Sequence, residues 1–311
     1  MTKEVEDSLE KIPIVNWLIK LGKKIKIPGL LGMSLYDIIE MYIIGIVKGA
    51  LTSRAGGISF SFFMALFPFI LFILTLIPFV PIEGFQEDFL IMIEQLLPPN
   101  TAETVHYVIE DIAKTKYSGL LSFGFIASIF LMTNGVNAIL GGFEYSYHVL
   151  EMRSIIRQYF ISMGMSILLA LILVVTVAIT LYFEIGINDL KAKGWLEDEV
   201  FWIKKGQFLF FVLLIFVSVS FLYKYGTKTV KHHSFFTPGS ILTTILTIVM
   251  FRLFSIYVLK FATYNELYGS IGTLLVLMLF VWLNSIILLL GFELNASISS
   301  LKRIRLIEKG I

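Results

Sequence analysis

One arginine stands inside an otherwise apolar stretch of this 311-residue sequence and is the first candidate for chemistry. If that stretch is a membrane helix, Arg252 lies roughly 20 Å from the inner surface, just beyond mid-membrane. Asn284 and Pro68 come to about the same depth on two other stretches. A guanidinium has five donors, which an asparagine carbonyl or a proline-freed backbone carbonyl can accept. Arg252 could therefore be a structural strut, or it could bind an anion or a lipid headgroup.

A second set of polar residues is expected nearer the cytoplasmic surface. Ser61, Asn134, Asn137 and Asn295 fall within roughly 10 Å of that surface when depth is counted along the helices. Asn295 shares a helical stripe with Asn284, so the two could join the arginine to an inner mouth. We take these residues, together with the arginine, as candidates for substrate binding.

Glu293 is a carboxylate near the end of the last apolar stretch. By helical periodicity it points away from the face that carries Asn284. It could pair with a cytoplasmic base such as Lys302, or it could couple transport to a proton. The sequence leaves both interpretations open.

The segment SRAGGISFSFFMALFP, residues 53–68, opens an apolar stretch with residues that suit a membrane helix poorly. On a helix, Gly57, Ser61, Ala65 and Pro68 share one face. Small residues allow helices to approach closely in a bilayer, and a proline usually bends a helix. This face predicts either close packing with a kink or the wall of a cavity, with Gly57 and Pro68 as candidate hinges.

The composition identifies the solvent in which these residues must act. Apolar residues make up 57% of the chain, charged residues only 15%, and the mean hydropathy is +0.85. Soluble domains do not reach such values, so we expect an all-α polytopic membrane protein. There is no cysteine, which excludes disulfides, thiolate metal sites and a cysteine nucleophile.

Six transmembrane helices are predicted from apolar stretches of roughly 20 residues or more. They cover residues 55–80, 118–141, 158–184, 206–223, 238–260 and 270–297. We therefore divide the chain into an N-terminal cytoplasmic part (1–54), a transmembrane domain (55–297) and a basic cytoplasmic tail (298–311).

Two further helical regions are expected outside the spans. Residues 36–51 are apolar nearly all round with scattered charges, which favours an interfacial helix before the first span. The polar excursion 82–117 is expected to hold two short extracytoplasmic helices separated by Pro98 and Pro99.

The distribution of lysine and arginine predicts the orientation. The segments on the side of the two termini carry 17 of these residues, and the alternate connections carry 7. Because basic residues concentrate on the cytoplasmic side, both termini are expected in the cytoplasm.

Three segments, in this order and spacing, carry a resemblance to a known family. They are residues 53–68, TNGVNAILGGFEYSYHVLEMRS at 133–154 and YGSIGTLLVLMLFVWLNSIILLLGFELNA at 268–296. Over nearly its whole length the chain resembles the YihY/BrkB family of bacterial inner-membrane proteins. It departs at residues 56–60, where members more often have alanine-rich residues leading to a tyrosine.

The resemblance implies a six-span helical protein of the bacterial plasma membrane. Members have been named as ribonucleases, formerly ribonuclease BN, as serum-resistance factors and as candidate transporters. A metal-dependent nuclease needs several ligands that converge on a metal ion. The four histidines, His106, His148, His232 and His233, show no metal-ligand spacing. We therefore expect no enzyme, no cofactor, no metal and no nucleic-acid partner.

The leading hypothesis is a transporter or flippase. It would handle an anionic or amphiphilic solute, a membrane lipid included, through an inward-opening polar cavity between spans one, two, five and six. Arg252 would attract the negative group. The alternatives are a non-transporting envelope factor that acts through partners and, third, an intramembrane enzyme.

Overall fold

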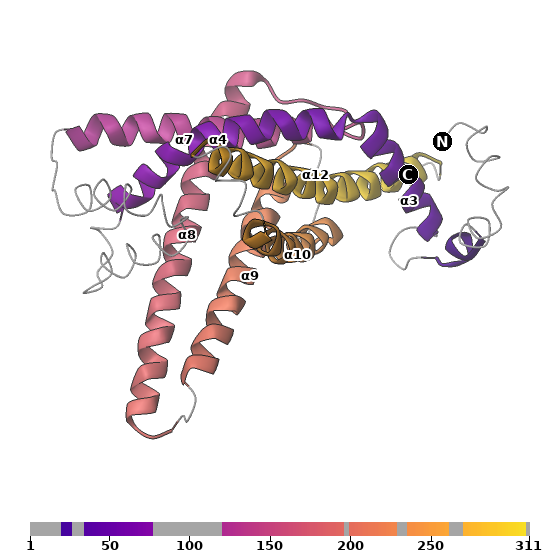
Figure 1. The fold of residues 1–311 in the computed structure, drawn as a ribbon. Helices are drawn as coiled ribbons and strands as arrows, with labels where there is room; N and C mark the ends of the chain where they lie inside the picture. Colours follow the sequence, from indigo (N-terminus) through magenta and orange to yellow (C-terminus); the bar gives the residue numbers. More distant parts are fainter. Residues whose placement is uncertain are drawn as a thin grey trace. The chain divides into compact units, whose positions relative to one another are not determined.

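The computed structural model is all-α in the part of the chain that it describes, as expected (Figure 1). The described residues are 20–26, 34–76, 120–195, 199–228, 235–260 and 270–308. The helices are α3 (Leu35–Lys48), α4 (Leu51–Leu76), α7 (Leu120–Glu144), α8 (Ile155–Ala192), α9 (Glu199–Tyr225), α10 (Pro238–Lys260) and α12 (Ser270–Glu308). The two short helices predicted within 82–117 lie outside the described residues.

Four of these helices are long and apolar enough to cross a membrane. Their membrane-length segments are Ile155–Lys191, Phe201–Tyr225, Pro238–Val258 and Leu274–Glu308. These segments coincide with the third to sixth predicted spans, so the multi-pass membrane class is supported. The first and second predicted spans correspond to α4, with 26 residues, and α7, with 25 residues.

The last helix is longer than the predicted span. It ends at Glu308 and contains 39 residues, so most of the predicted basic tail continues the helix. The sequence after Gly291 has no glycine or proline up to Glu308, and nothing there interrupts a helix.

α3 begins at a capping box. The Asp37 amide donates to Ser34 Oγ at 3.2 Å, and the Ser34 amide donates to Asp37 Oδ2 at 2.9 Å. This reciprocal pair satisfies two backbone donors at the start of the helix. Gly49 and Ala50 then separate α3 from α4, and Ala50 has φ 46°, a left-handed conformation. The helix predicted over 36–51 therefore exists, with slightly different ends.

The chain divides into two compact units. The first comprises Met1–Ser59, Ile139–Arg153 and Val219–Ile311, and the second comprises Phe60–Ala138 and Ser154–Ser218. α4, α7 and α9 each contribute residues to both units.

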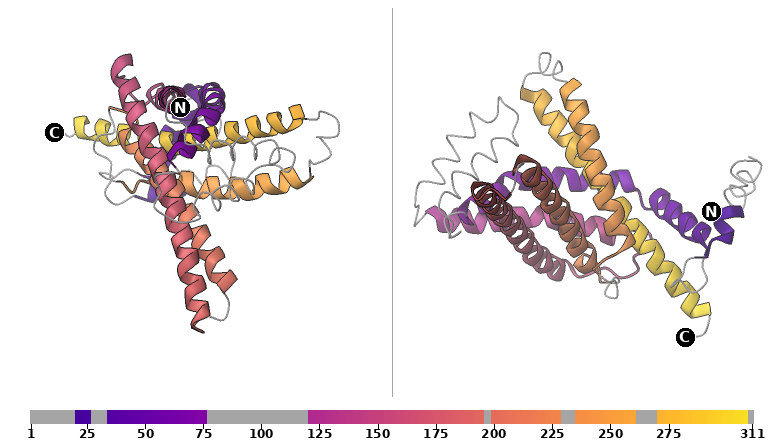
Figure 2. Two further views of the ribbon diagram at one scale, coloured as in Figure 1. Left: turned by 90° about the vertical axis from the view of Figure 1, so that its left-hand side faces the viewer. Right: turned by 90° about the horizontal axis from the view of Figure 1, so that it is seen from below.

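In the first unit, α10 and α12 pack side by side (Figure 2). The Gly239 amide donates to Asn295 Oδ1 at 2.9 Å. Further along α10, the Thr243 hydroxyl lies 2.6 Å from Tyr223 Oη. Tyr223 Oη in turn donates to the Leu288 carbonyl of α12 at 2.6 Å. Residues further along α10 have partners with lower residue numbers in α12, so the two helices are antiparallel.

Glycine permits this close contact. A Cβ at Gly291 would lie 1.9 Å from Thr243 Oγ1 and 2.6 Å from the Gly239 carbonyl oxygen. Distances this short exclude any larger residue unless a helix shifts. The α10–α12 contact thus follows the small-residue rule for helix packing in membranes.

In the second unit, α8 and the first part of α9 form an antiparallel pair (Figure 1). The Phe183 and Phe210 rings pack edge to face at 5.4 Å, and a Cβ at Gly206 would collide with the Phe183 ring. α7 packs on α4 through Gly135, where a Cβ would lie 2.9 Å from Ala65 Cβ. Ala65 is therefore a packing residue, as its place on the small-residue face of the first predicted span indicated.

Candidate functional site: a buried ionic cluster

An arginine and a glutamate from opposite ends of the sequence form a buried ion pair in the first unit. Arg54 Nη2 donates to Glu293 Oε1 at 2.5 Å, and Arg54 Nη1 donates to the Gly142 carbonyl at 2.8 Å. The side chain of Arg54 is 7% exposed and that of Glu293 is 0% exposed. Charges this deeply buried are tolerated only when they are paired and hydrogen-bonded.

The second carboxylate oxygen of Glu293 also has a partner. Ser146, in the segment that follows α7, donates its hydroxyl to Glu293 Oε2 at 2.9 Å. The guanidinium is less well satisfied, because Arg54 Nε is buried without a hydrogen-bond partner among the described groups. The carboxylate is therefore fully engaged, whereas the arginine retains one unused donor.

The backbone of α3 closes over this pair. A Cβ at Gly45 would lie 2.8 Å from Glu293 Oε2 and 2.7 Å from His148 Nε2, and a Cβ at Gly49 would lie 2.8 Å from Arg54 Nη2. Only glycine allows the helix to approach the charged groups this closely. The two glycines, one helical turn apart, thus let α3 seal the cluster.

His148 connects α3 to the cluster. Its Nε2 lies 3.0 Å from the Met41 carbonyl oxygen. A carbonyl oxygen can only accept, so Nε2 carries the proton. Burial lowers the pKa of His148, while the bond to Met41 and the charge of Glu293 raise it and the charge of Arg303 lowers it further. Burial dominates, so the imidazole is neutral at pH 7.

Tyr42, on α3, is a second titratable group that senses the charge of Glu293. Burial and then the negative charge of Glu293 raise its pKa to about 12. Its phenol therefore remains protonated throughout the physiological range.

An aromatic layer packs beside the ion pair. Phe143 stacks on Phe292 with centroids 4.3 Å apart, and both are fully buried. Tyr223 packs against Phe143 edge to face at 5.6 Å. Phe292 directly precedes Glu293 on α12, so the aromatic packing and the ion pair hold adjacent residues of one helix.

Three of the predicted site residues lie in the first unit but do not form the predicted network. The Arg252 side chain is exposed. Asn284 Nδ2 donates to the Phe280 carbonyl of its own helix at 2.8 Å. Asn295 is buried, and it bonds to Gly239 and, through Nδ2 at 2.9 Å, to Thr237 Oγ1. Asn295 is thus a packing group of the α10–α12 contact in this conformation.

The other predicted site residues are on α4 and α7. Asn137 accepts a hydrogen bond from Ser162 of α8 at 3.2 Å, and Asn134 is exposed. Ser61 is partly buried, and Pro68 is buried inside the continuous helix α4. A Cβ at Gly57 would meet no described atom within 4 Å, so close packing does not explain this glycine.

The sequence interpretation missed the cluster itself. Pairing of Glu293 with a base was an open alternative, but the suggested partner, Lys302, was wrong, because Arg54 holds the carboxylate. A signal was present: Arg54 and Glu293 have opposite charges at the cytoplasmic ends of two predicted spans. Among the described residues, no group of three or more His, Asp or Glu is placed to hold a metal ion.

Replacement of Arg54 by methionine should lower the free energy of unfolding by about 3–5 kcal/mol, because it leaves the Glu293 carboxylate buried without a cation. The double change Arg54→Met/Glu293→Leu should recover most of that loss, since neither charge then remains. Thermal or denaturant unfolding of purified protein in detergent measures both effects. Arg157→Met, at an exposed arginine of α8, is the matched control and should be nearly neutral. A single Arg54 variant as stable as this control would contradict the buried pair.

The free energy of unfolding should fall as the pH is lowered below 6.5, the ordinary pKa of histidine. Since the folded pKa of His148 is lowered, the unfolded chain binds this proton more readily, and stability is complete only above that pH. His148→Gln retains an N–H donor for the Met41 carbonyl but does not titrate. Unfolding measured from pH 7.5 to 5 should therefore show a weaker pH dependence in this variant. Superimposable profiles would show that His148 does not titrate on unfolding.

Comparison with known proteins agrees with this architecture. A family model described as "Virulence factor BrkB" matches residues 45–307. Over 261 residues the chain is 31% identical to YfkH of Bacillus subtilis (strain 168), a protein named as ribonuclease-like, and the match covers 81% of this chain and 91% of that protein. No solved structure gave a significant match. The chain belongs to the BrkB (YihY) family of membrane proteins.

Proposed function

We propose that this protein is a six-span transporter or flippase of the bacterial plasma membrane that moves an anionic or amphiphilic solute, a lipid included. The observation that carries the proposal is the exposed arginine within a membrane-length helix. Arg252 lies in the segment Pro238–Val258, and its side chain is exposed. A guanidinium at that depth cannot face hydrocarbon without a large cost, so it must face water, a ligand or a partner.

The surroundings of Arg252 support a free rather than a locked arginine. Among the described contacts no hydrogen bond joins Arg252 to Asn284, whose Nδ2 donates to the Phe280 carbonyl of its own helix. Among the described residues no carboxylate pairs with Arg252, in contrast to Arg54, which pairs with Glu293. A permanent cation with this exposure would attract the phosphate or carboxylate of a solute that enters an inward-opening polar cavity.

The ionic cluster would then act as the inner seal. In the closed arrangement the charges of Arg54 and Glu293 compensate each other beneath α3. Opening the inner side would require this pair to separate, which would free the guanidinium, a group that already has one unused donor.

The six-span arrangement with both termini in the cytoplasm is part of this proposal. α4 and α7 exceed the roughly 20 residues that a span requires, and the basic residues favour the side of the termini. α3 would lie in the cytoplasmic interface, since its exposed side chains include Ile39, Ile43 and Val47. A membrane path for an anionic or amphiphilic solute needs no metal or nucleic acid, and we propose no nuclease activity.

One observation favours the alternative, a non-transporting envelope factor. The α10–α12 contact is closely packed, with Gly239 and Gly291 leaving no space for a side chain, and Asn295 fills its donors and acceptors inside it. A bundle of this kind could serve only to present loops to partners. The two functions differ in whether the polar groups ever meet a solute.

Single cysteines in this cysteine-free chain test the orientation. Gln86→Cys and Lys193→Cys should react with an impermeant maleimide added outside intact cells, because both connections are proposed to face outward. Val230→Cys and Leu306→Cys should react only after the membrane is opened. Outside labelling at position 230 or 306 would contradict the six-span map.

Transport is tested by reconstitution of purified protein into vesicles that contain a fluorescently labelled phosphatidylglycerol, whose movement between leaflets is followed by quenching. Arg252→Leu should abolish the movement without lowering the melting temperature, and Arg252→Lys should retain part of it by keeping the charge. Arg157→Leu is the matched control at another exposed arginine. A large drop in melting temperature for Arg252→Leu, recovered by Asn284→Leu, would mean that Arg252 is a structural strut.

A further inference from the structure

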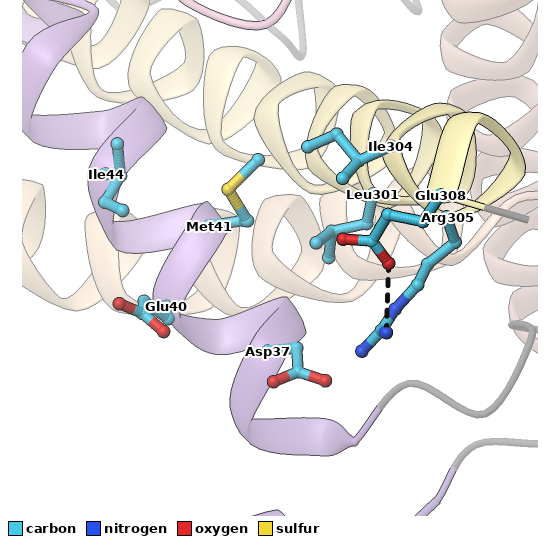
Figure 3. Close-up of a pocket in the computed structure, with 8 residues that line it drawn as sticks. All are labelled: Asp37, Glu40, Met41, Ile44, Leu301, Ile304, Arg305 and Glu308. Carbon is cyan, nitrogen blue, oxygen red and sulfur yellow. Dashed lines mark hydrogen bonds and ion pairs between the residues drawn. The ribbon is translucent and has the colours of Figure 1, made fainter.

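A groove of about 300 Å³ lies between α3 and the C-terminal end of α12 (Figure 3). It is lined by Asp37, Glu40, Met41, Ile44, Leu301, Ile304, Arg305 and Glu308. Beneath it, Ile38 and Ile298 form a small buried core with Leu294 and Leu301 packed against it. The groove is therefore built on a fixed contact between two helices.

Charged groups of both signs line the groove. The carboxylates of Asp37 and Glu40 come from α3, and the guanidinium of Arg305 comes from α12 and extends toward the start of α3 (Figure 3). Arg305 pairs with Glu308 at 3.2 Å, but the two side chains are 42% and 55% exposed. An exposed pair of this kind contributes little, so an anion with better geometry can replace Glu308.

Apolar side chains line the groove beside its charged groups. Met41 and Ile44 of α3 face Leu301 and Ile304 of α12 across the floor. A ligand that fits must therefore combine a cation, an anion and an apolar part. A soluble ion satisfies only one end and leaves the apolar floor uncovered.

The surroundings of the groove indicate where such a ligand would come from. Large apolar side chains are exposed on other faces of the same two helices: Ile39, Ile43 and Val47 on α3, and Leu306 and Ile307 on α12. On a membrane protein, exposed apolar side chains next to charged ones are typical of the interface with lipid headgroups. The groove then opens at the depth of the headgroups and the first acyl carbons.

We propose that this groove binds a zwitterionic phospholipid with a primary ammonium, such as phosphatidylethanolamine, from the cytoplasmic leaflet. The ammonium donates to the carboxylates of Asp37 and Glu40, the phosphate accepts a bidentate pair of bonds from Arg305, and the start of one acyl chain covers Met41 and Ile304. The proposal rests on the interfacial placement of α3 and of the end of α12 in the proposed topology, and not on transport.

The charges of the groove discriminate among lipids. A phosphatidylglycerol headgroup brings an anion without a cation, and it would face three carboxylates with one guanidinium to hold it. A phosphatidylcholine headgroup brings a cation without N–H donors, so the carboxylates of α3 would lose their hydrogen bonds. Phosphatidylethanolamine alone of these three meets both ends of the groove.

Native mass spectrometry of the purified protein in detergent tests the site. The protein is incubated with equal amounts of phosphatidylethanolamine, phosphatidylcholine and phosphatidylglycerol with identical acyl chains, and bound lipid is counted. Phosphatidylethanolamine should be retained over each of the others by about fivefold, the effect of roughly one net hydrogen bond. Equal retention of the three lipids would overturn the proposal.

Matched variants place the lipid in this groove. Arg305→Gln should remove the selective retention, whereas Lys302→Gln, one turn away on α12 and outside the lining, should keep it. Ile304→Ser should weaken retention, whereas Leu306→Ser should not, although the two leucine-sized side chains are 41% and 38% exposed. All four positions are at least partly exposed, so the variants should fold. Equal effects of the groove and control variants would refute the site.

The outcome is separable from that of the transport experiment. Selective retention without lipid movement in vesicles would refute transport and leave this site standing. Outside labelling of Leu306→Cys would instead remove the interfacial placement, and with it the proposed source of the lipid.

Discussion

The buried pair of Arg54 and Glu293 is the interaction on which the first unit depends. Two charges without access to water are stable only when every neighbouring group is arranged for them. The Gly142 carbonyl, the Ser146 hydroxyl and the glycines of α3 meet that demand. An isolated buried charge costs several kcal/mol in desolvation. Arg54 and Glu293 therefore each need the opposite charge, and the groups around them must keep the pair together.

This constraint connects segments that are far apart in the chain. Arg54 and Glu293 are 239 residues apart, and the groups around them come from α3, α7, the segment after α7 and the two helices that carry the pair, α4 and α12. Glu293 also lies two residues from Asn295, which fixes the start of α10 through the Gly239 amide. The position of α10 and that of the ion pair are thus set by neighbouring residues of one helix.

The sequence was sufficient to predict where the helices lie, but not which residues they contact. Hydropathy placed membrane-length helices near residues 158–184 and 270–297, because apolar length depends only on local composition. Periodicity also placed Glu293 on a different face from Asn284. It could not identify the partner, since helix packing depends on side-chain shapes and close glycine contacts that a single sequence does not show.

The polar residues illustrate the same limit. Asn284 and Asn137 were expected to line a cavity, but a helix carbonyl or a neighbouring hydroxyl already uses a polar group of each. An asparagine in a membrane helix satisfies its amide locally when it can, because an unpaired amide in hydrocarbon is costly. His148, in the segment after α7, is likewise buried and bonded to the Met41 carbonyl of α3. The type of a residue predicts that its side chain needs hydrogen-bond partners, but it does not identify them.

A comparison of Arg54 and Arg252 shows how an ion pair changes the role of an arginine. Arg54 is buried, and its charge is compensated, so it stabilises one arrangement of the first unit. Arg252 is exposed within a membrane-length helix, and among the described residues no acidic side chain compensates its charge. A compensated charge resists change, whereas an exposed one is available to whatever anion approaches. If the protein moves a solute, the first arginine sets the cost of opening and the second sets the sign of the charge that is attracted.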